Sequence, residues 1–419
     1  MSNSFFASRG GQWLDEDEIL AHFASVVRLE NLGLFLGAGA SCGAIGGKAL
    51  STVWADFIKR KPDDCAWLVE QGFIIEGFNI ELLLDSLEIT KYEWTRINAS
   101  RRLKKLNEIR NNLLRGVIEA AFLKEEFWKI PQSLDSIPKE LQAHCEVLQK
   151  LCTSRQPGQA APWIFTTNYD LSIEWSAEVL SLQVINGFSG LHYRSFSPHN
   201  FDLGFRNLHS KGEARFGTYN VYLGKLHGSL SWKLCEEDLV IEEAAFALYK
   251  TYKDFLDGKI HELPNLLVYP GVSKYFQTTG FVFSEVFRRF SEFLSRSHSC
   301  LIVNGYSFCD SHLNRLLKSA LQNPTLQVII FLPELSCQDK EWDLQHISSL
   351  WIRKLIELKL PQVTFIGGKE KAYFDRLATY LPDPPIYDEY SIQIKENLKK
   401  LKSSTPKSNE STDNYKRPV

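Results

Sequence analysis

The sequence predicts an α/β fold built on a doubly wound parallel sheet with helices on both faces. Three observations predict it: short apolar runs recur along the chain, most of them alternate with helical stretches, and several end in Gly, Ser, Asn or His. Alternation of this kind places parallel strands side by side, with the connecting helices covering them. With 419 residues and 44% hydrophobic content, the chain can bury a core of more than one layer.

The first part of the chain predicts a helix, a strand and a second helix. Residues 15–30 have the spacing of an amphipathic helix and begin with acidic side chains, which suit the helix dipole. The apolar run 31–36 then leads into a glycine turn, as a buried parallel strand does, and 49–60 reads as the next helix. This segment is therefore expected to begin the sheet.

Residues 62–150 predict an inserted, all-helical module, because they have helical periodicity, charge-rich faces and little β character. The apolar side chains at 80–84 and 113–114 have two interpretations. They fill the core of the module itself, which is favoured for each helix taken singly, or they pack against neighbouring subunits.

The sheet is expected to resume at 162–166, followed by a helix at 170–181 and a long loop at 186–218. Loops of that length in compact domains are usually functional. Further strands are expected at 219–226, 265–269, 299–304, 325–332 and 362–366, and helices at about 280–296, 311–322, 339–358 and 370–381. The predicted division is a Rossmann-like domain of residues 1–61 and 151–394, the helical insertion 62–150, and a disordered basic tail 395–419.

Composition excludes several classes of protein. The net charge of −2 provides no global basic field, so direct binding of nucleic acid is not expected. The N-terminus lacks the pattern of a signal peptide, and the longest apolar runs are far shorter than the ~20 residues of a membrane span. The eight cysteines form no Cys-x-x-Cys pair, so neither a disulfide framework nor a structural zinc site is expected. We expect a cytoplasmic protein that contacts no membrane and needs no zinc.

The segment Gly37-Ala38-Gly39-Ala40-Ser41 follows a predicted strand and precedes a helix. Glycines let the backbone approach a pyrophosphate, and a helix N-terminus supplies N–H groups for the anion. Dehydrogenase and Walker A fingerprints would each need glycine where the chain has cysteine, at position 42. A tight turn without a ligand is the alternative, but the strand–turn–helix context favours a nucleotide.

Three later strand ends carry polar groups of their own. The first ends in Thr167, Asn168 and Asp170, at the edge where ligands bind in open α/β sheets. Turn and N-cap roles are the alternative for Asn168 and Asp170. The second ends in His227, which can titrate near neutral pH or serve as a structural histidine.

The third strand end contains Gly305 and Ser307, which suit contacts to a ribose or a phosphate. Asp310 and His312 follow, and they are as easily explained as capping and packing residues.

In this order, the segments GAGAS, TTNYD, KLHGS and GYSFCD resemble the sirtuin (silent information regulator) superfamily over roughly residues 30–380. The chain looks most similar to bacterial sirtuin-like proteins of antiphage defence that hydrolyse NAD, and among them to partners of the HerA-type ATPase. The closer likeness lies in 156–170, 186–193, 211–217, 224–232 and 268–275.

The resemblance implies a set of NAD-binding residues, namely Gly37, Ala38, Gly39, Ser41, Thr167, Asp170, Gly305 and Ser307. Among them, the glycine-loop residues line the pyrophosphate and Ser307 lies on the adenosine side. Asn168 and Asp170 face the nicotinamide and its ribose, and His227 is the catalytic base.

The activity implied is that of an NAD glycohydrolase, which releases nicotinamide and ADP-ribose and depletes NAD in antiphage defence (abortive infection). The missing Cys-x-x-Cys pairs, and Thr167 in place of the glutamine usual before the catalytic Asn, argue against protein deacylation. Deacylation and non-catalytic NAD binding as a scaffold or sensor remain the alternatives. The resemblance also implies a large homo-oligomer that docks a HerA-type ATPase ring.

Overall fold

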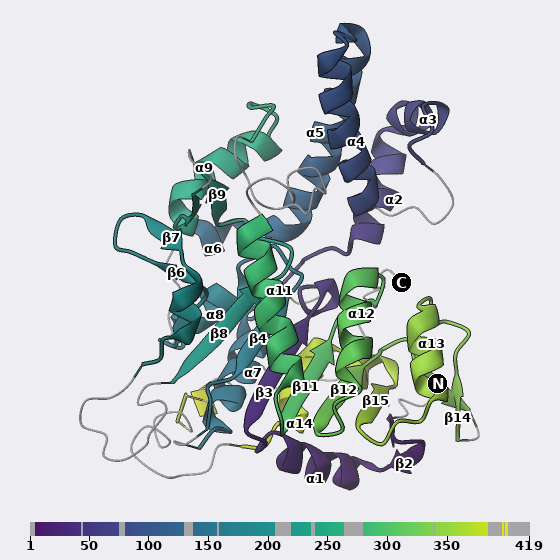
Figure 1. Cartoon of the computed structure of the whole chain (residues 1–419), viewed down its shortest axis with the longest axis vertical. Coiled ribbons are helices and arrows are strands. Elements are labelled where there is room, and N and C mark those ends of the chain that lie inside the picture. The colour runs from purple at the N-terminus through teal and green to yellow at the C-terminus, as the bar shows by residue number, and fades with distance from the viewer. Residues whose placement is uncertain are drawn as a thin grey trace.

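The computed structural model describes residues 5–42, 45–74, 80–129, 137–156, 159–205, 219–235, 239–263, 280–338, 340–383, 396–397 and 399–400. A nine-stranded sheet forms one end of the molecule (Figure 1), in the order β2-β1-β15-β12-β11-β3-β4-β8-β5. Its strands are β1 (Phe6–Arg9), β2 (Gln12–Leu14), β3 (Asn31–Leu36), β4 (Trp163–Thr166), β5 (Gln183–Ile185), β8 (Asn220–Lys225), β11 (Ser299–Asn304), β12 (Leu326–Phe331) and β15 (Val363–Gly367).

The chain order of these strands confirms the predicted doubly wound α/β fold. From β3 the chain builds outward through β4 to β8, then returns to β11 on the other side of β3 and continues to β12 and β15. All neighbouring pairs from β15 to β5 are parallel. The direction of winding therefore switches between β3 and β11, where open α/β sheets bind their ligands. The antiparallel edge hairpin β1–β2 was not predicted.

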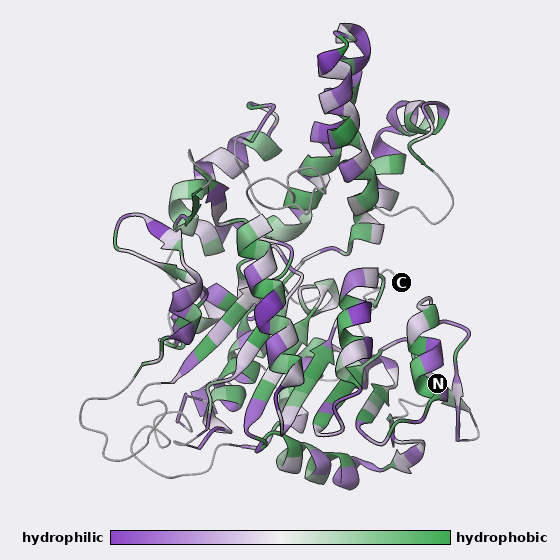
Figure 2. Ribbon diagram, in the orientation of Figure 1, coloured by the Kyte–Doolittle hydropathy of each residue, from purple (hydrophilic) through white to green (hydrophobic). Residues whose placement is uncertain are grey.

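Helices cover both faces of the sheet because its strands are apolar on both sides. Leu34 and Ile302 face one layer, formed by α1 (Glu16–Val26), α7 (Gln142–Thr153), α8 (Ser172–Val179) and α14 (Phe374–Tyr380). Phe35 and Leu301 face the other, formed by α11 (Gly280–Ser295), α12 (Ser311–Ala320) and α13 (Leu350–Glu357). Neighbouring residues of a strand point to opposite faces. Hydrophobic residues accordingly dominate the strands in Figure 2.

A second core includes Trp175 and Val179 of α8 and joins further helices, most of which lie at the opposite end of the molecule in Figure 1. They are α2 (Leu50–Arg60), α3 (Pro62–Glu70), α4 (Ile80–Arg96), α5 (Ser100–Phe122), α6 (Glu125–Lys129) and α9 (Ala245–Leu256). The predicted apolar side chains at 80–84 and 113–114 mostly fill this core, whereas Leu82 is 55% exposed. The helix α7 packs instead on α8 and α14. The division of the chain into domains stays a prediction.

Two ranges differ from their expected secondary structure. Within 186–218, expected to be a loop, β6 (Phe188–Ser189) and β7 (Arg194–Phe196) join a small antiparallel sheet. The helix predicted at 339–358 is wrong in its first half, because β14 (Glu341–Asp343) pairs there with β13 (Ser336–Gln338) and α13 begins only at Leu350. The expected strand 265–269 lies outside the described residues, as do most of the tail residues.

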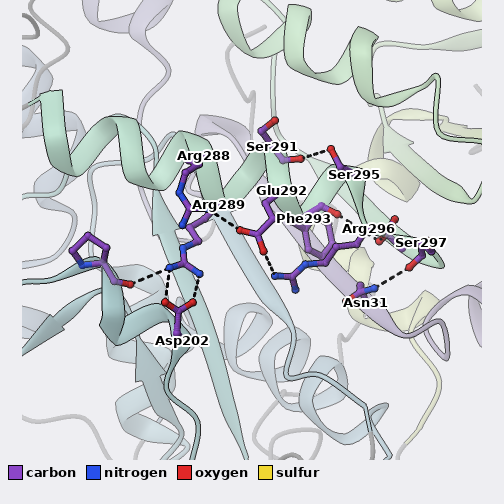
Figure 3. A network of polar contacts seen from close by, with 12 residues as sticks. Asn31, Asp202, Arg288, Arg289, Ser291, Glu292, Phe293, Ser295, Arg296 and Ser297 are labelled. Atoms are coloured by element: carbon purple, nitrogen blue, oxygen red, sulfur yellow. Dashed lines mark hydrogen bonds and ion pairs between the residues drawn. The ribbon is translucent and has the colours of Figure 1, made fainter.

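A buried arginine joins the segment after β7 to the helix layer. Arg289 of α11 donates hydrogen bonds to both carboxylate oxygens of Asp202, as Figure 3 shows. It also donates to the carbonyl oxygen of Pro198. Its Nε also donates to Glu285 at 2.7 Å. These bonds fix the 3-10 turn Pro198–Asp202 on α11 and therefore beside the sheet.

Candidate functional site

The four predicted motifs meet at one edge of the sheet, since they follow the carboxyl ends of four adjacent strands. Across β11, β3, β4 and β8, the register pairs Asn304 with Leu36, Leu36 with Thr166, and Thr166 with Lys225. The loops that leave these strands therefore begin side by side. The sequence predicted each of these polar strand ends separately, and the structure shows that they are adjacent.

The glycine loop packs directly against the loop after β11. The amide of Gly39 donates to the carbonyl oxygen of Gly305 at 2.8 Å, and the amide of Gly37 donates to that of Asn304 at 3.1 Å. A Cβ on Gly37 would lie 2.5 Å from the Gly305 oxygen, and Gly305 itself has a φ of +69°. These glycines thus allow two loops to touch. Ala38 is half-buried and Gly39 exposed, and their contact with a pyrophosphate stays a prediction.

Asn168 joins the loop after β4 to the glycine loop. Its Nδ2 donates to the carbonyl oxygen of Gly37 at 3.0 Å and to Ser41 Oγ at 2.9 Å. Because a backbone carbonyl can only accept, these bonds fix which way the amide group points. Both amide hydrogens are used within the protein, so the oxygen of the side chain is the group that can meet a ligand.

Asp170 connects the same loop to helix α8. Its Oδ2 accepts a hydrogen bond from Ser41 Oγ at 2.7 Å, and its Oδ1 accepts one from the Ser172 amide at 3.0 Å. The turn role that was the alternative for Asp170 is therefore real, and the same side chain also belongs to the Asn168 network. The Thr167 amide donates to Leu36 at 3.1 Å.

His227 follows β8 and is 7% exposed. Its Nε2 lies 3.2 Å from Oδ2 of Asp310, whose Oδ1 accepts from the amides of His312 and Leu313 and caps helix α12. Burial acts to raise the pKa of Asp310. The hydrogen bond and charge of His227, together with the hydrogen bonds from the amides of Leu313 and His312, outweigh this effect, so the pKa lies below its usual value. The carboxylate consequently stays ionised at neutral pH beside the imidazole.

Sequence reasoning gave Asp310 only a capping or packing role, because nothing local shows that a residue 83 positions after His227 contacts its ring. The one signal was its place just after a polar strand end. Ser307 is exposed at the same edge, two residues after Gly305.

The described residues contain no group of three or more His, Cys, Asp or Glu side chains placed to hold a metal ion. All eight cysteines are free thiols in the structure. Among the helices that the structure describes, none is long and apolar enough to cross a membrane.

The fold and this site describe an α/β protein whose four motif loops meet at the switch point of a doubly wound sheet, where open α/β sheets bind their ligands. The family model of the SIR2-like domain matches residues 162–352. This range contains the strand ends that carry Asn168, His227 and Gly305, and the match supports a sirtuin-like, NAD-related domain. No curated protein matches the chain significantly.

Proposed function

We propose that the protein is an NAD glycohydrolase that cleaves the nicotinamide–ribose bond of NAD. The observation that supports this most is the adjacency of Asn168 and His227. Thr166 and Lys225 are paired across β4 and β8, and Asn168 and His227 each follow their strand's member of this pair by two residues. The Leu226 amide also donates a hydrogen bond to the Thr166 oxygen at 2.8 Å. An amide oxygen and an imidazole thus stand on neighbouring strand ends.

In the proposed reaction, the C–N bond between ribose C1′ and nicotinamide breaks, and its electron pair leaves with nicotinamide as a neutral molecule. Positive charge develops on the ribose ring, as in glycoside hydrolysis. The side-chain oxygen of Asn168 orients a ribose hydroxyl and the attacking water. His227 takes a proton from that water as its oxygen bonds to C1′, which yields ADP-ribose. The leaving group needs no general acid.

Asp310 supports this role of His227. An ionised carboxylate hydrogen-bonded to an imidazole holds the ring in one orientation and stabilises the imidazolium that forms when the ring accepts a proton. The low pKa of Asp310 keeps that charge in place at neutral pH.

Product analysis by mass spectrometry after incubation of the full chain with NAD tests the proposal. ADP-ribose with nicotinamide supports hydrolysis, and a cyclic product indicates intramolecular capture. An acylated ribose formed with an acylated peptide indicates deacylation, and no product indicates binding without turnover.

We expect Asn168→Ala and His227→Ala to lower the rate of cleavage at least about 10²-fold. Near-full turnover by His227→Ala would mean that His227 has only a structural role.

We also propose that the protein acts inside the cell in antiphage defence, as a large homo-oligomer that docks a HerA-type ATPase ring. Uncontrolled loss of NAD would kill the host, so the activity needs control by assembly. The exposed apolar side chains of α4, Leu82, Ile89 and Tyr92, offer a contact surface. Light scattering with and without the ATPase tests this. A monomer that hydrolyses NAD at full rate alone would contradict it.

A further inference from the structure

Lys225, the last residue of β8, is a buried cation below the candidate site. It is 2% exposed, and its Nζ donates a hydrogen bond to the backbone oxygen of Asp170. It also pairs with Glu174 Oε1 of α8 at 3.0 Å. A buried ammonium group is costly unless it is paired and hydrogen-bonded, so these two contacts explain how the fold tolerates it.

Lys225 connects the two halves of the site. It belongs to the strand that leads into His227, and it holds the loop that carries Asn168. From Asp170 the hydrogen bonds continue through Ser41 to the side chain of Asn168. Asp170 therefore links the end of β8 to the amide of Asn168, because its backbone oxygen accepts from Lys225 and its side chain accepts from Ser41.

Stability alone accounts poorly for this ion pair. Glu174 Oε2 is buried and has no hydrogen-bond partner among the described residues. Burial raises the pKa of Glu174, against the lowering effect of the Lys225 charge. Well-packed apolar residues often replace such a pair without loss of stability. What an apolar pair could not do is donate a hydrogen bond to the Asp170 backbone.

We propose that Lys225 is a positioning residue that sets the Asn168 loop against His227 for the cleavage of NAD. The inference rests on the proposed function. Lys225 acts through Asp170 and Ser41 and has no contact with substrate. Its removal should therefore slow the chemical step more than it weakens substrate binding.

Two variants separate positioning from stability. Lys225→Met leaves Glu174 unpaired, so we expect the melting temperature to fall by about 5 °C and kcat to fall about 10²-fold. The double variant Lys225→Met/Glu174→Leu replaces the pair with apolar side chains. We expect it to regain most of the melting temperature while kcat stays about 10²-fold low and KM changes less than about threefold.

Lys150→Met is the matched control. Lys150 is a second buried lysine, and its Nζ donates to the backbone oxygens of Ala378 at 2.8 Å and Leu381 at 3.0 Å, away from the motif loops. Its loss should lower the melting temperature and leave kcat unchanged.

The outcomes distinguish the two proposals. A double variant with wild-type kcat, or one in which only KM rises, overturns the positioning role. A wild-type protein that releases no nicotinamide overturns the proposed function instead. In that case, hydrogen exchange of the amides at 167–172 decides the positioning role: faster exchange in the double variant than in Lys150→Met supports it, and equal exchange overturns it.

Discussion

The site edge of the sheet and the helical cluster of α2–α6 and α9 pair their buried charged groups differently. The helical cluster buries a large apolar core, and its buried carboxylates Asp64 and Glu88 pair with the partly exposed Lys105 and Arg110. At the site edge, Ser41, Asp170 and Lys225 are each at most 5% exposed. Ser41 and Lys225 both donate hydrogen bonds to Asp170. The site edge therefore buries a cation together with its partners, whereas the helical cluster pairs its buried carboxylates with cations that solvent reaches.

This difference has an energetic consequence. A buried polar group costs stability unless its hydrogen bonds are made, and those bonds need one geometry. Apolar contacts are non-directional and tolerate adjustment. We therefore expect changes at the sheet and its site edge to have larger effects than comparable changes in the helical cluster.

The largest effect should come from acid. Burial lowers the pKa of His22 and of His144 to about 4, and both histidines pack in the layers of the sheet. The unfolded chain binds protons near pH 6.5 while the folded histidines stay neutral. The free energy of unfolding should thus fall as the pH decreases from 6.5 to 4, by about 3 kcal/mol for each histidine. Urea unfolding at several pH values measures this.

His144→Leu should remove about half of that pH dependence. The exposed His192 provides the control, since His192→Leu should leave the dependence as it is. If the free energy of unfolding of His144→Leu depended on pH as strongly as that of the wild type, the prediction would be wrong.

Glycine substitutions compare the two regions directly. An added Cβ at Gly37 meets backbone of the Gly305 loop at 2.5 Å, whereas Gly72, between α3 and α4, has a φ of +76° and no neighbour within 4 Å. We expect Gly37→Ala to cost about 3 kcal/mol of unfolding free energy and Gly72→Ala about 1 kcal/mol. Equal costs in urea unfolding would remove the distinction between the regions.

Asp310→Asn separates the capping role from the role beside His227. Asparagine caps a helix as well as aspartate does, so the melting temperature should change little. The carboxylate next to His227 is lost, so we expect turnover of NAD to fall about tenfold. Steady-state kinetics measures this effect, and a wild-type rate would restrict Asp310 to its cap.

The smallest effect should come from the surface of the helical cluster. Glu119 pairs with Arg60 at 3.3 Å and with Lys48 at 3.6 Å, and all three side chains are about a third exposed or more. Glu119→Ala should change the unfolding free energy by no more than about 1 kcal/mol, and less at high salt. A larger loss would mean that Glu119 stabilises the helical cluster through contacts other than these two ion pairs.

Some elements could be predicted closely because their signal is local. The strands at 31–36 and 299–304 have the predicted bounds, since a strand buried on both faces has a nearly continuous apolar run along its centre. The hairpin at 336–343 was missed because its two strands are only three residues long and carry polar and charged side chains. Short pairs of this kind have no distinct pattern.

The sequence by itself determined most of the buried parallel strands, most of the helices that alternate with them, and the polar residues just past the strand ends, because periodicity and turn chemistry act over a few residues. Only the tertiary structure decided that β11 returns to the side of β3, which brings Gly305 against Gly37 and Asp310 against His227. Contacts between residues so far apart in the chain depend on the order of strands in the sheet. No local pattern encodes that order, so these partners had to be found in the fold.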